Sequence, residues 1–391
     1  MNGIFPCLIS LVLTTFSGCG GVTDYMSEWV AGEEPTEPPA PLVELKPTLT
    51  VEALWSEDVG SGGPKQHLKL VPVAVGDQIF TADRKGYFCA IDATTGKRIW
   101  EQDTDTVISG GLGAGDELVL VGTSDGEVLA LSQERGEILW KSTVSSEVLA
   151  SPQAAEGTVV ARTLDGRLFG LEATSGARLW VYDRQVPVLT LRGTSAPVVV
   201  SGRVIAGFDN GSLVALDLKT GKLIWETPLA QPRGRTELER MVDIDAEPVI
   251  FDETIYAATF QGRVAAISLD SGQVDWDRDL SSYAGIGVDP DNVYLTDAQS
   301  YVWALDRYSG ASVWKQDKLH GRAVTAPVPL GEYIVVGDFE GYLHWMRKED
   351  GRFAARIELD SSPITVPPLA MDHTLVALSS SGTLSAYRLH Y

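Results

Sequence analysis

Cysteine and basic side chains are scarce in this sequence, and each shortage excludes a class of function. Cys7, Cys19 and Cys89 are the three cysteines in 391 residues, too few for a disulfide framework or a zinc site built from several thiolates. The five histidines show no close spacing, so we expect no metal site. Lysine and arginine number 31 against 53 acidic residues, a formal net charge of −22. Such a chain lacks the positive surface that binds nucleic acid, and an anionic bilayer surface repels it.

The N-terminus has the features of an export signal. Residues 4–16 are mostly apolar but too short to span a membrane as a helix. The ending Phe16-Ser17-Gly18-Cys19 resembles a bacterial lipobox, in which the cysteine carries the lipid. Phe16 replaces the usual leucine and no basic residue precedes Lys46, so a plain secretory signal with an incidental cysteine remains the alternative. By the same resemblance, Gly20 after the cysteine favours the outer membrane.

These observations divide the chain into three parts. We expect a signal peptide at residues 1–18 and a lipidated Cys19 that begins a tether over residues 19–47. The tether is acidic and rich in proline, a composition that buries no core and favours extended polyproline II. The remaining residues, 48–391, are predicted to form the folded domain.

A repeat runs through that domain. A second glycine follows ten residues after the first, and a tryptophan position follows four residues later. The first positions are Gly86, Gly126, Gly166, Gly211, Gly262, Ser300, Gly341 and Gly382. The tryptophan positions are Trp100, Trp140, Trp180, Trp225, Trp276, Trp314 and Ala355, and the eighth copy ends before reaching its own.

Each repeat predicts about four short strands in roughly 43 residues, which is the size of a propeller blade. The strand after each first glycine is apolar on both faces, so both faces are covered. Its central position is small in every copy except at Trp345. The segment 52–55 has the pattern of the outer strand that the eighth copy lacks, so we expect the N-terminal strand to close the ring. The predicted fold is an all-β, eight-bladed β-propeller.

The turn and tryptophan at 90–100 and 215–225 resemble the quinoprotein-type (PQQ-like) repeat. Two families with this repeat are the pyrroloquinoline-quinone dehydrogenases and the BamB family, lipoproteins of the β-barrel assembly machinery (the BAM complex) of the bacterial outer membrane. Segments 336–353, 189–197 and 241–245 are similar to BamB, and the resemblance covers roughly 48–391. It implies a non-enzymatic, lipid-anchored scaffold on the periplasmic side of the outer membrane. Such a scaffold would bind the periplasmic POTRA domains of BamA and aid the folding and insertion of outer-membrane proteins.

Two neighbouring inter-blade connections, within 181–210 and 226–261, carry the largest internal excess of residues. Neighbouring insertions on one face of a rigid ring are a usual way to build a binding surface. The BamB resemblance implies that BamA contacts the side chains Leu189, Leu191, Arg192, Asp243 and Asp245. Two alternatives stay open: the leucines pack against the blade, and Arg192 pairs with one of the two aspartates within the chain.

No catalytic set and no cofactor site is predicted. His344 and Cys89 lie on predicted strands, where we expect them to be packed core residues, and the glycines of 110–115 precede no helical pattern. We expect a monomer, and pairing of nascent outer-membrane strands with exposed blade edges is a second hypothesis. The alternative functions are a PQQ-binding quinoprotein oxidoreductase and a generic periplasmic interaction propeller.

Overall fold

The computed structural model describes residues 38–60, 70–184, 195–230, 242–244, 246–259, 262–282 and 284–390. In these ranges the chain forms 32 β-strands, which pair antiparallel into eight four-stranded sheets. The sheets are the blades of a propeller formed by the unit Pro39–Tyr391, and blade 1 is the sheet that begins with β2. The predicted fold class and blade number are confirmed.

Blades 1 to 7 each use four consecutive strands, and blade 8 combines the last three strands with the first. Blades 1 and 2 are β2 (Val73–Val75), β3 (Gln78–Ala82), β4 (Tyr87–Asp92), β5 (Arg98–Asp103), β6 (Gly113–Gly115), β7 (Leu118–Gly122), β8 (Glu127–Ser132) and β9 (Ile138–Thr143). Blades 3 and 4 are β10 (Gln153–Ala155), β11 (Thr158–Arg162), β12 (Leu168–Glu172), β13 (Arg178–Tyr182), β14 (Val198–Val200), β15 (Arg203–Gly207), β16 (Ser212–Asp217) and β17 (Leu223–Pro228). Blades 5 and 6 are β18 (Val249–Phe251), β19 (Thr254–Ala258), β20 (Arg263–Ser268), β21 (Val274–Asp279), β22 (Ile286–Val288), β23 (Asn292–Thr296), β24 (Val302–Asp306) and β25 (Ser312–Gln316). Blades 7 and 8 are β26 (Val328–Leu330), β27 (Tyr333–Gly337), β28 (Tyr342–Arg347), β29 (Phe353–Glu358), β30 (Leu369–Met371), β31 (Thr374–Leu378), β32 (Thr383–His390) and β1 (Thr50–Asp58).

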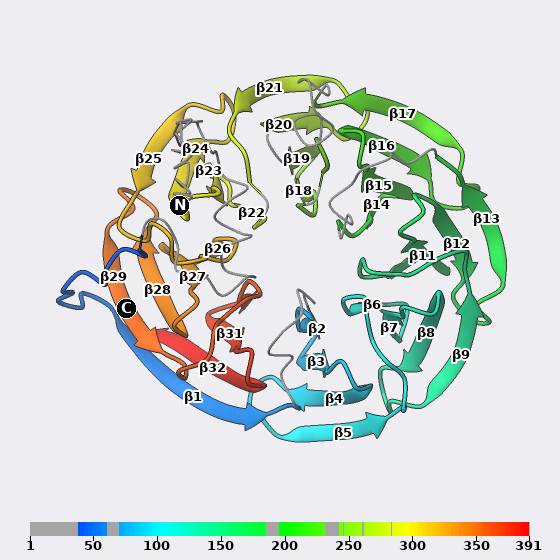
Figure 1. The fold of residues 1–391 in the computed structure, drawn as a ribbon, viewed down its shortest axis with the longest axis horizontal. Coiled ribbons are helices and arrows are strands. Elements are labelled where there is room, and N and C mark those ends of the chain that lie inside the picture. Colours follow the sequence, from blue (N-terminus) through cyan, green and yellow to red (C-terminus); the bar gives the residue numbers. More distant parts are fainter. Residues whose placement is uncertain are drawn as a thin grey trace, which may run out of the picture. The chain divides into compact units, whose positions relative to one another are not determined.

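The blades surround a central axis, with the short strand of each blade innermost and the tryptophan strand at the rim (Figure 1). In blade 8 the rim strand is β1, which pairs antiparallel with β32. Trp55 of β1 stands opposite Ala386, in the same way that Trp100 stands opposite Ala90 in blade 1. The N-terminal strand therefore closes the ring, as predicted.

The third strand of each blade is buried on both faces because the neighbouring blades cover it. In β8, the residues from Val128 to Leu131 have no exposed surface. Their side chains divide between two hydrophobic clusters, one shared with blade 1 and one with blade 3. This explains why the central residues of these strands are mostly apolar on both faces instead of alternating with polar ones.

The rim tryptophans join each blade to the next. The Trp140 indole N–H donates to the Ala173 carbonyl of the following blade at 2.8 Å, and the ring lies on Gly176. Gly176 has a φ of +70°, and a Cβ there would come within 2.5 Å of the indole. The same donation, at 2.7–3.1 Å, is made by Trp55, Trp100, Trp180, Trp225, Trp276 and Trp314. The repeated glycine and tryptophan are therefore two halves of one inter-blade contact.

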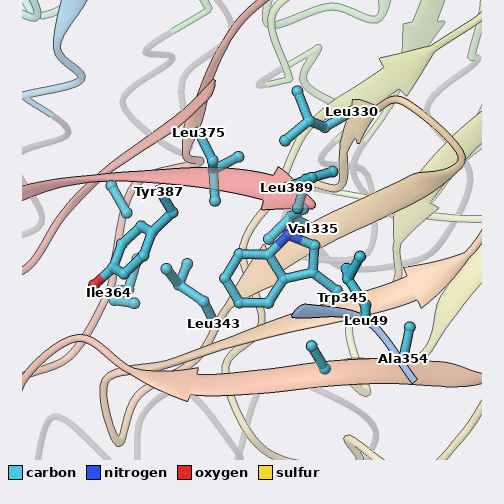
Figure 2. Packing of buried hydrophobic residues seen from close by; sticks show 12 residues of the cluster. Leu49, Leu330, Val335, Leu343, Trp345, Ala354, Ile364, Leu375, Tyr387 and Leu389 are labelled. Carbon is cyan, nitrogen blue, oxygen red and sulfur yellow. The ribbon is translucent and has the colours of Figure 1, made fainter. Parts of the chain in front are cut away.

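Blade 7 is the exception, and ring closure explains it. Its rim position is Ala355, because blade 8 has no glycine turn on which a tryptophan could lie. Trp345 faces Ala355 across the ladder, so the large and small residues have exchanged strands. Figure 2 shows the Trp345 indole among Leu343, Val335 and Tyr387, and its side chain is fully buried.

The segment that precedes β1 is attached to the connection before blade 7 and to β29. The Ala40 amide donates to the His320 carbonyl at 2.9 Å, and the Ala40 carbonyl accepts a bond from Arg322. The Val43 carbonyl accepts from Arg356 at 3.0 Å. The sequence predicts a tether that extends to residue 47, whereas hydrogen bonds to the propeller already begin at Ala40.

Candidate partner-binding site

The two long connections join consecutive blades at the same face of the ring. One runs from β13 to β14 and the other from β17 to β18, so each passes from the rim of one blade to the innermost strand of the next. Each blade has four antiparallel strands, so every rim strand ends at the face of the ring where the inner strand of the next blade begins. Blade 4 lies between the two connections and borders both.

The structure describes both ends of each connection but not its middle. Leu189, Leu191, Arg192 and Asp245 lie outside the described residues, as does the predicted lipidation site Cys19. Their assignments remain predictions. The residues on either side of them show how the chain enters and leaves each loop.

Asp243 is described, and its side chain has no exposed surface. Its neighbours Val242 and Ile244 are buried as well. The resemblance implies a partner contact at Asp243, but a carboxylate with no exposed surface is not accessible to a partner. Its position instead favours a role within the second loop.

Both ends of the second loop meet at one glycine of blade 4. A Cβ at Gly211 would come 2.8 Å from the Ala230 carbonyl oxygen and 3.1 Å from Val242 Cγ2. The φ of Gly211 is +75°, so a side chain is disfavoured there by the backbone conformation too. Ile244 lies on Gly207, where a Cβ would come within 2.4 Å of its Cγ2. Two glycines of blade 4 thus allow the loop ends to pack directly on its backbone.

The first loop begins at an ion pair with the rim of blade 4. The Arg184 guanidinium donates to Glu226 of β17, and this hydrogen bond holds the pKa of the Glu226 carboxyl below its usual value. The guanidinium also lies 5.3 Å from the ring centroid of Phe208, which follows β15. Blade 4 therefore contacts the start of one loop and both ends of the other.

Three features of the sequence, His344, Cys89 and the glycines of 110–115, have structural positions in the blades. His344 is fully buried and its Nε2 lies 2.8 Å from Asp338 Oδ2, which confirms it as a packed core residue. Cys89 is also fully buried, and burial raises the pKa of its thiol. The glycines of 110–115 lead into β6 (Gly113–Gly115), the innermost strand of blade 2, and not into a helix.

No group of three or more His, Cys, Asp or Glu side chains in the described ranges is arranged to hold a metal ion. Nowhere in those ranges does a helix reach the length and apolar character needed to cross a bilayer.

The propeller geometry and the tryptophan-to-glycine contact between blades define a class, the eight-bladed quinoprotein-type propellers. A quinohemoprotein alcohol dehydrogenase from Comamonas testosteroni has this fold, with a TM-score of 0.70 over 86% of this chain and 76% of that chain. The two sequences are 14% identical, so the likeness concerns the fold alone.

The sequence places the chain more narrowly. The family model described as outer membrane protein assembly factor BamB matches residues 49–108 and 84–316. BamB of Alkalilimnicola ehrlichii is 49% identical over 341 residues, covering 87% of this chain and 89% of that protein. BamB of Pseudomonas aeruginosa is 46% identical over 352 residues, covering 90% and 93%. The chain belongs to the BamB family.

A solved structure agrees with this assignment. The crystal structure of BamB from Moraxella catarrhalis has a TM-score of 0.78 and 27% identity. The match covers 87% of this chain and all of that one. The family membership groups this chain with assembly factors and not with the quinone-dependent dehydrogenases.

Proposed function

We propose that this protein is a non-enzymatic subunit of the BAM complex in the outer membrane of a Gram-negative bacterium. In this role it binds the periplasmic POTRA domains of BamA and aids the folding and insertion of outer-membrane proteins. The observation that carries the proposal is the 49% identity to a BamB over 87% of the chain. The two long connections, whose described ends pack on blade 4, support the same role, because neighbouring insertions on a rigid ring are a usual way to build a binding surface.

The proposed contact has an apolar centre and a charged surround. Leu189 and Leu191 act as anchors, and Arg192 pairs with an acidic group of the partner. Asp245 belongs to the same surface. Asp243 supports the second loop from within, because its carboxylate is buried.

The proposed location is the periplasmic side of the outer membrane, with the lipid on Cys19. The protein then reaches BamA from a membrane anchor instead of by free diffusion. Growth with radiolabelled palmitate tests the anchor, since a Cys19→Ala variant should lose the label.

A pull-down tests the partner and the site together. The full chain, purified in detergent, is mixed with the immobilised periplasmic domains of BamA from the same host. Arg192→Glu should abolish capture, since it places a like charge against the partner's acidic group. Arg352→Glu is the matched control: it makes the same charge change at an 82% exposed side chain of blade 7. The control should bind like the wild type.

The outcomes separate function from site. Capture of the wild type and the control but not of Arg192→Glu supports both. Equal capture of all three would overturn the assignment of Arg192 and leave the function standing. A wild-type chain that is not captured would overturn the proposed partner.

A further inference from the structure

We propose that a buried ion pair between Arg162 and Asp209 holds the ends of the two long connections in fixed positions relative to each other, and that partner binding depends on it. The inference rests on the function proposed above and adds residues that the family resemblance does not indicate. Arg162 and Asp209 are positioning residues, because neither is exposed to a partner: their side chains are 3% and 7% exposed.

Arg162 links blade 3 to the end of the first loop. It is the last residue of β11, and its Nη2 donates to Asp209 Oδ1 at 2.6 Å. Its Nη1 donates to the Ser195 carbonyl at 3.3 Å. Ser195 is where the described chain resumes after the first loop, so the guanidinium holds both that end and the turn of blade 4.

Ser195 continues the connection to the second loop. Its hydroxyl donates to the Ala246 carbonyl at 3.3 Å, and Ala246 directly precedes the approach to β18. One chain of hydrogen bonds therefore runs from Arg162 through Ser195 to the return of the second loop. The two loop ends that it joins are 51 residues apart in the sequence.

Phe208 adds a second route between the same segments. Its ring centroid is 5.4 Å from the Arg162 guanidinium carbon and 5.3 Å from that of Arg184, at the start of the first loop. Its carbonyl accepts the Ile244 amide of the second loop at 3.4 Å. A shift of the Arg162 guanidinium would thus change the contacts at the beginning of the first loop and at the ends of both loops.

The fold itself does not require a charge at this position. The residues four places before the first glycine in other repeats are uncharged: Ala82, Gly122, Gly207, Ala258, Thr296, Gly337 and Leu378. A buried ion pair gives little net stability compared with apolar packing, and its best-attested use is to fix one arrangement among several. Arg162 lies on blade 3, where the first connection begins, and Asp209 lies on blade 4, where the first connection ends and the second begins. This is why we assign it to loop placement.

Blade 7 supplies a matched control. Arg322 and Asp338 form a pair with 3% and 0% exposed side chains, at 2.8 Å. Arg322 also holds a backbone carbonyl, that of Ala40, in the segment before β1. The two pairs share chemistry and burial but lie on different blades, and only the first bonds to residues that flank the long connections.

The test compares Arg162→Gln with Arg322→Gln in the full chain. Thermal unfolding measures stability, and biolayer interferometry against the immobilised BamA periplasmic domains measures binding. Both variants should lower the unfolding temperature, because each leaves a buried carboxylate without its cation. Only Arg162→Gln should weaken binding, by about tenfold or more, mainly through faster dissociation. Ser195→Ala, which keeps the ion pair and removes the bond to Ala246, should weaken binding with little change in unfolding temperature.

A double-mutant cycle separates positioning from general damage. If Arg162 acts through the first loop, Arg162→Gln combined with Leu189→Ala should weaken binding less than the product of the two single effects. Three results would overturn this inference and leave the proposed function standing. They are additive losses of affinity in the double-mutant cycle, equal losses of affinity in Arg162→Gln and Arg322→Gln, and full affinity of both Arg162→Gln and Ser195→Ala. A wild-type chain that does not bind would overturn the proposed function and, with it, this inference.

Discussion

The contact between Trp140 and the next blade should contribute several kcal/mol to the stability of the ring. Trp140 is 8% exposed, lies on Gly176 and donates its indole N–H to Ala173 at 2.8 Å. Replacement by alanine removes about 200 Å² of buried surface, or about 5 kcal/mol as an upper limit at ~25 cal/mol/Å². The lost hydrogen bond adds about 1 kcal/mol, and partial collapse of the neighbours lowers the sum. We expect Trp140→Ala to cost about 4 kcal/mol.

This cost corresponds to a measurable shift in unfolding. The unfolding entropy of a unit of roughly 350 residues is about 0.7 kcal/mol/K, so the melting temperature should fall by about 6 °C. Far-UV circular dichroism in urea and on heating is the suitable measurement, because tryptophan fluorescence changes with the substitution itself. Trp140→Phe keeps most of the apolar surface and should lose only part of the stability.

Leu139→Ala is the control for this experiment. Leu139 is the neighbour of Trp140 in β9 but is 52% exposed, so its loss should cost less than about 1 kcal/mol. If Trp140→Ala and Leu139→Ala differ by less than 1 kcal/mol or so, the rim tryptophans do not hold the blades together.

Three further predictions follow from buried groups and from the N-terminal segment. Burial keeps His344 neutral and lowers its pKa, and its Nδ1 accepts from Arg356; stability should therefore fall as the pH drops below about 6.5, where the unfolded chain takes up a proton that the fold excludes. Urea midpoints from pH 8 to pH 5.5 test this, and His344→Gln should flatten the profile; parallel profiles would contradict it. The backbone of residues 39–47 forms hydrogen bonds with the propeller, so deleting these residues should lower the melting temperature, whereas deleting residues 20–38 should not. Calorimetry measures both melting temperatures. Equal values for the two deletion variants would show that the attachment adds no stability. Cys89 is fully buried and the pKa of its thiol is raised, so it should react with iodoacetamide at pH 8 only after urea unfolds the protein. The experiment uses a variant in which Cys7 and Cys19 are replaced, so that Cys89 is the one thiol. Rapid labelling of the native protein would refute its burial.

Much of the architecture was predictable from the sequence because each blade repeats one local pattern. The apolar runs that precede three of the first glycines, at 78–82, 203–206 and 333–336, coincide with β3, β15 and β27 to within one residue. The hydrophobic pattern of a strand and the glycines of a turn depend on only a few neighbouring residues, so a single repeat is enough to detect them. Counting the repeats then determined the number of blades and the closing strand.

The exchange of Trp345 and Ala355 could not be explained from the repeat. The sequence shows that Trp345 is an exception, but the reason for the exception lies in the neighbouring blade, which lacks the glycine turn. A repeat specifies which strand a residue belongs to, whereas a side chain's partner in the next blade depends on how the ring closes.

The candidate site depended on tertiary structure to an even greater extent. The lengths and neighbourhood of the two connections were visible in the sequence. The burial of Asp243 and the pairing of Arg162 with Asp209, 47 residues away, were not. The one signal for Arg162 was a charge at a strand end that is uncharged in the other repeats. The sequence by itself determined the ring and its two long connections through local periodicity, and only the tertiary structure decided which side chains meet across blades, because those contacts join segments that no local pattern relates.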